Sequence, residues 1–575
     1  MGKRRSQRQG RRARPTEEVQ AEERLARYAM GFAGELADLD SLPNGDGVAL
    51  IAALNERALR RAGDHAAHPE LLPAVGWRVG YAIGVGDRAL AQLNAPWHWN
   101  EVSESLESRW LKELRTGLDT FARAAWCFRF GYTLAGIALA RRHIERWTYN
   151  LASSAGVPPR EGEEDAGYFD RVWSTYDNMR DVSVGRDWSR LSEVLHGRSI
   201  ELGGRAVRVD LRMQLADAVR VHNFALRAME VSLRQVRGAI KTAIDERQPN
   251  SSVAPFLWMP LDGFPRASVP PDFLMVFFEP LDYEFAMSDR AEVYSSWGST
   301  YRRIAEGRSD AGEFITEFEA WMAIEERWVR AIDESRVAFT DEATTLGSRA
   351  NPVIVHATIA RYRCVAEMAD LVAPSIQDPE HRAAMRGAAA ALESAWVLWL
   401  QDVDDSLTCM RMVLECTARA RTYRLKPERA QRLAERGASS TPYRWAEAAG
   451  WSRLAPFVRA LGEFSHVRER SRHDGSRDLL TAIQQGAIEG HELQTGRGSA
   501  LSEVASMLAH EVVHTLLAVS PDLAATFRTV TLAESEEETE SELAGWLDRA
   551  MSFRGHDFGD AEYRFSRVSD EDQGG

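Results

Sequence analysis

The sequence predicts an all-α protein: two related helical bundles joined by a proline-rich connector, with at most a short strand or two. Three observations support this prediction. Apolar residues recur at helical spacing along most of the 575-residue chain, prolines crowd into one central stretch, and a short motif occurs once on each side of it. Hydrophobic residues make up 44% and charged residues 27%, which is ordinary for a globular protein.

Helical periodicity is clearest late in the chain. Leu407, Met410, Leu414, Thr417 and Ala418 form one apolar stripe, and an i, i+4 charge ladder (Arg411, Glu415, Arg419) lies on another face. The same spacing predicts helices over 20–62, 104–152, 211–245, 311–345, 352–371, 379–424 and 499–519.

The proline-rich stretch divides the chain. Prolines at this density cannot lie inside helices, and they stand at Pro249, Pro255, Pro260, Pro265, Pro270, Pro271 and Pro280. We therefore expect a first helical module over 16–248, a connector over 249–290 and a second module over 291–562. Residues 1–15 are predicted to be a disordered basic arm, and residues 563–575 a disordered polar tail.

Charge and composition restrict the partners and the compartment. The net charge of -14 would repel a polyanion, and no apolar signal core follows the basic N-terminus. The most apolar stretch, 124–140, is interrupted by Arg129 and is shorter than a bilayer span, so no membrane association is expected. None of the four cysteines forms a C-x-x-C pair, which predicts reduced, packed thiols in a cytoplasmic protein.

An L-x-E-x-x-H-x-R motif occurs at 191–198 and again at 461–468, each time after a Trp-Ser-Arg-Leu tetrad. This similarity predicts an internal duplication. Glu463 and His466, like Glu193 and His196, are three residues apart and are expected to meet on one helix face. Such a pair is either an acid–base or ligand pair, or a polar clasp between packed helices.

The second copy carries a family resemblance. Its Leu-Gly-Glu-Phe-Ser-His run, after a long Arg-rich helix, resembles uncharacterised bacterial helical proteins, some of which are related to HEPN-type and abortive-infection proteins. The resemblance covers about residues 380–475 and, more faintly, 104–200. HEPN ribonucleases carry an arginine, four to six residues and then a histidine, and Arg468 and His473 have this spacing. The resemblance implies a metal-independent RNase acting on RNA, with Arg468 stabilising phosphate charge and His473 serving as acid or base. The first copy lacks a matching histidine after Arg198.

The segment His510-Glu511-Val512-Val513-His514 matches the zincin signature H-E-x-x-H. On a helix the two histidines could share a zinc ion while Glu511 acts as general base, with a third ligand from the acidic run at 534–542. Against this, the preceding residues predict more helix instead of a sheet. Glu503 and Ser506 also lie on the same helix face as the two histidines, and a polar stripe of this kind is typical of an ordinary half-exposed helix.

These observations predict an intracellular helical scaffold or binding protein that needs no cofactor. The alternatives are a HEPN-like RNase in a defence context and a zinc-dependent hydrolase. The oligomeric state stays open, with a homodimer as one candidate.

Overall fold

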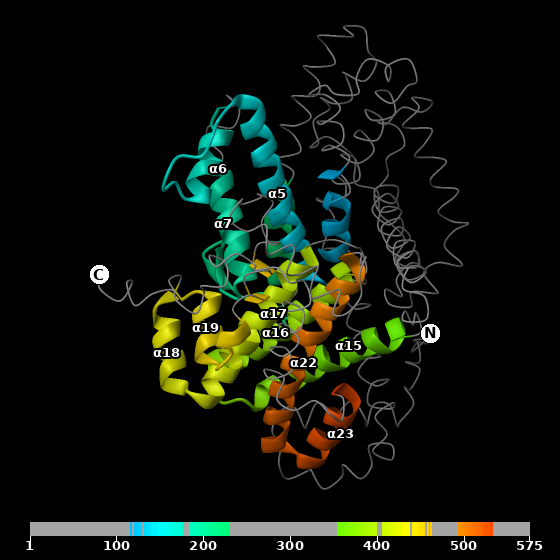
Figure 1. Ribbon diagram of the computed structural model, residues 1–575. Coiled ribbons are helices and arrows are strands. Elements are labelled where there is room, and N and C mark those ends of the chain that lie inside the picture. The colour runs from blue at the N-terminus through cyan, green and yellow to red at the C-terminus, as the bar shows by residue number, and fades with distance from the viewer. Residues whose placement is uncertain are drawn as a thin grey trace, which may run out of the picture.

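The computed structural model describes residues 116–117, 120–128, 131–175, 183–214, 216–229, 354–399, 405–437, 440–454, 457–458, 461–462 and 493–532. These residues are mostly helical, and they include one two-stranded sheet, so the mainly helical class is confirmed (Figure 1). The basic arm, the connector and the polar tail predicted from the sequence lie outside them. We refer to the described residues of 116–229 as the first segment and to those of 354–532 as the second segment.

Three helices form the body of the first segment: α5 (Thr133–Ala155), α6 (Asp165–Trp173) and α7 (Val184–Leu195). They pack together on one side of the molecule (Figure 1). Helix α5 ends where Gly156 adopts a left-handed conformation with φ of 63°. The Trp173 indole N–H donates to Thr148 Oγ1 (2.8 Å), so the polar atom of this buried ring is satisfied within the core.

Helices α6 and α7 meet closely at Gly185. A Cβ at this position would lie 1.9 Å from the carbonyl oxygen of Ala166. We therefore expect Gly185→Ala to lower the free energy of unfolding by about 1–3 kcal/mol, the usual range for overpacking, because the two helices must separate. Gly167→Ala on α6 is the matched control: its Cβ would meet no atom within 4 Å. Thermal unfolding followed by circular dichroism would contradict the close contact if both variants melted alike.

A short antiparallel hairpin follows α7. Strands β1 (Ile200–Leu202) and β2 (Arg205–Val207) pair Ile200 with Val207, and Gly203 and Gly204 form the turn with φ of 61° and 76°. Two consecutive positive φ angles suit the turns that join tightly twisted strands. This hairpin accounts for the short strand or two expected from the sequence.

The second segment is centred on α17 (Asp405–Leu425). Helix α17 packs against α16 (Pro379–Trp399), α22 (Leu493–Val519), α18 (Pro427–Glu435) and α19 (Pro442–Ala448). Helix α15 (Ile354–Val372) runs into the 3-10 turn Ala373–Ser375 and packs on α16 and α22. A second 3-10 turn, Ser452–Leu454, follows α19, and α23 (Pro521–Thr531) packs on α22.

The helix boundaries agree with the sequence in part. The helices predicted over 352–371 and 499–519 are found as α15 and α22. The single helix predicted over 379–424 is wrong, because it is two helices, α16 and α17, packed against each other. Apolar residues at helical spacing do not show where the chain reverses direction when both helices of the pair are apolar.

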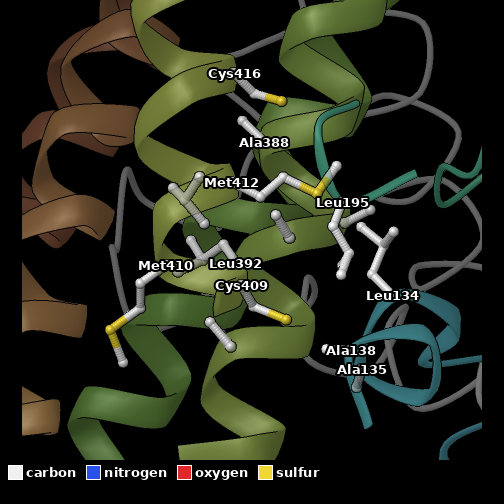
Figure 2. Close-up of a cluster of buried hydrophobic side chains, with 14 of the residues drawn as sticks. Leu134, Ala135, Ala138, Leu195, Ala388, Leu392, Cys409, Met410, Met412 and Cys416 are labelled. Atoms are coloured by element: carbon white, nitrogen blue, oxygen red, sulfur yellow. The ribbon is translucent and has the colours of Figure 1, made fainter. Parts of the chain in front are cut away.

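The two segments share one hydrophobic core. In Figure 2, Leu134 and Ala138 of α5 and the nearby Leu195 face side chains of α16 and α17, among them Leu392 and Cys409. All four cysteines are buried and none forms a disulfide with another, as expected of small apolar residues. The described parts of the two predicted modules are therefore joined through a common apolar interface.

Candidate functional site

Helix α22 carries the H-E-x-x-H signature. Glu511 is buried, with 1% of its surface exposed; His510 is also buried, and His514 is partly exposed. Glu511 points at α17, where Arg424 donates to both carboxylate oxygens: Nε lies 2.8 Å from Oε2 and Nη2 lies 2.7 Å from Oε1. Arg421 adds a third donor at 3.3 Å from Oε1. Both oxygens of the predicted general base are thus occupied by guanidinium N–H groups.

The two arginines are themselves fixed. Arg421 Nε donates to the carbonyl oxygen of Ala449 (3.1 Å), and its guanidinium lies 5.5 Å from the Trp451 ring centroid. Arginine is suited to such paired, planar contacts with a carboxylate. A general base on zinc-bound water needs an accessible lone pair within hydrogen-bond reach of that water. The geometry favours a structural role for Glu511, holding α22 against the end of α17.

The metal hypothesis rests on His510 and His514. Across the described ranges, no cluster of three or more His, Cys, Asp or Glu side chains is placed to hold a metal ion. The acidic run that could supply a third ligand, beginning at Glu534, lies outside those ranges.

The first copy of the repeated motif is at the end of α7. The helix stops at Leu195, and His196 occupies the C-cap, followed by Gly197 with φ of 69°. The expected side-chain pairing of Glu193 with His196 is not made, although the His196 backbone N–H donates to the Glu193 carbonyl oxygen (3.1 Å). Glu193 instead accepts two hydrogen bonds from Arg198 Nη1 (3.0 and 2.7 Å). His196 leaves the helix, so the i, i+3 relation does not bring it to Glu193.

His196 reaches the second segment instead. Its Nδ1 lies 3.3 Å from Oε2 of Glu415 on α17. Glu415 is 2% exposed, and its other oxygen accepts from Arg419 one helical turn later. Burial alone would raise the pKa of Glu415, but Arg419 and the hydrogen bond with His196 outweigh it and lower the pKa to about 2. The clasp interpretation therefore describes His196, although its partner is on another helix.

The Gly197 turn also explains the close approach to α17. A Cβ at Gly197 would lie 3.2 Å from the Cys416 sulfur and 3.5 Å from Nη1 of Arg419. Arg419 in turn lies 5.4 Å from the Trp445 ring centroid. Glycine at this position satisfies the positive φ and leaves room for both neighbours.

Further polar contacts join the two segments. Arg212 donates to both oxygens of Asp370 (3.0 and 2.9 Å) and to its backbone carbonyl (3.0 Å). Arg198 Nη2 donates to the Gly437 carbonyl oxygen (3.3 Å). Two ion pairs, Arg142 with Asp405 (3.8 Å) and Arg208 with Glu380 (3.4 Å), also join the segments. In each contact the basic side chain belongs to the first segment and the acceptor to the second.

The remaining predicted site residues, Glu463, His466, Arg468 and His473, lie outside the described residues. The sequence did not indicate Arg421, Arg424 or the partnership of Glu415 with His196. The i, i+4 spacing of Glu415 and Arg419 signalled their ion pair, but nothing in the sequence connects Arg424 with Glu511, 87 residues away. Comparison of the chain with models of known families, with curated proteins and with solved structures gives no match.

Proposed function

We propose that this protein is a helical scaffold or binding protein, and that its H-E-x-x-H helix is a structural element. The observation that carries the proposal is the occupation of both Glu511 carboxylate oxygens by Arg424 and Arg421. To act as a base, the carboxylate would have to leave two guanidinium groups in a buried site. That separation is costly because it uncovers unpaired charge.

The contacts between the two segments support the same proposal. Asp370 and Glu415 are buried; Asp370 is paired with Arg212 of the first segment, and Glu415 is hydrogen-bonded to His196. The apolar layer of α5, α16 and α17 lies beside them. Polar and apolar contacts therefore hold the same interface together. An interface of this kind suits a rigid scaffold whose surface binds a ligand.

Metal analysis of the purified full-length protein tests the proposal against the hydrolase alternative. We expect zinc well below one equivalent and no change in metal content in His514→Ala, because Glu511 and its arginines hold the helix without a metal. Inductively coupled plasma mass spectrometry after dialysis measures this directly. One equivalent of zinc that is lost in His514→Ala would overturn the scaffold proposal in favour of a metal-dependent hydrolase.

The RNase alternative has its own test. A fluorogenic RNA oligonucleotide incubated with the protein in EDTA is expected to stay intact. Cleavage that disappears in His473→Ala, but persists in the nearby His491→Ala control, would replace the scaffold proposal by a metal-independent RNase.

A further inference from the structure

We draw no further inference here: the strongest candidate, the side-chain cluster in which the Tyr423 ring of α17 stacks on His381 of α16 and on Trp445 of α19, carries nothing, because these ring contacts belong to the packing of the three helices and nothing in the described part of the chain shows what the cluster would bind.

Discussion

Glu511→Ala is expected to lower the free energy of unfolding by about 3–5 kcal/mol, the cost of removing one partner from a buried ion pair. The substitution leaves Arg421, which is 9% exposed, and Arg424 without their shared carboxylate. Because Arg421 is also tied to Ala449 and Trp451, it cannot turn freely into solvent. A loss of this size is a large fraction of the stability of a typical domain.

Urea unfolding followed by circular dichroism measures the effect. Glu428→Ala is the control, since Glu428 is exposed on α18 and its removal should change stability by less than about 0.5 kcal/mol. A catalytic Glu511 would give a different result: the variant would lose a hydrolytic activity while keeping its stability. Equal stabilities of Glu511→Ala and Glu428→Ala would therefore contradict the structural role.

The protein is expected to lose stability as the pH falls below about 6.5, and His143 is the main described cause. This histidine is buried between the rings of Phe121 and Trp147, with centroids at 6.4 and 6.1 Å. Burial lowers its pKa from 6.5 to about 3, although a hydrogen bond with the Met229 backbone opposes the shift. Between these values the unfolded chain binds a proton that the folded protein does not. Each pH unit in this window therefore costs up to about 1.4 kcal/mol.

Chemical unfolding at a series of pH values between 6.5 and 5 tests this prediction. His143→Gln, which cannot be protonated, should flatten the dependence of the unfolding free energy on pH in this range. Glu163→Gln serves as the comparison, because Arg171 lowers the pKa of Glu163 from 4.5 to about 2. Its contribution is present above pH 4.5 and is lost as the pH falls toward 2, so it leaves the range above pH 5 unchanged. Parallel curves for His143→Gln and the unmodified protein would show that His143 does not cause the acid sensitivity.

Local pattern was enough to predict some of the helices, whereas α6, α7, α18, α19 and α23 lie outside the predicted ranges. The i, i+3 and i, i+4 spacing of apolar residues identified α15 and α22, and the Glu415–Arg419 ion pair also follows from spacing on one helix. Such patterns depend on residues within a turn or two of each other, so they can be recognised without knowledge of the fold. They failed where the chain reversed between α16 and α17, because periodicity carries no information on direction.

The partners of the polar residues were decided by tertiary structure. The sequence predicts Glu511 as a candidate general base of a zinc site, and it predicts that His196 lies beside Glu193. In the structure the first is held by Arg424, 87 residues away, and the second lies against Glu415, 219 residues away. The sequence by itself determined the helical class and several helix boundaries, since these depend on local spacing. Only the packing of α7 and α22 on α17 decided which charges meet, because a buried ion pair depends on which helices are neighbours and not on the residues beside it in the chain.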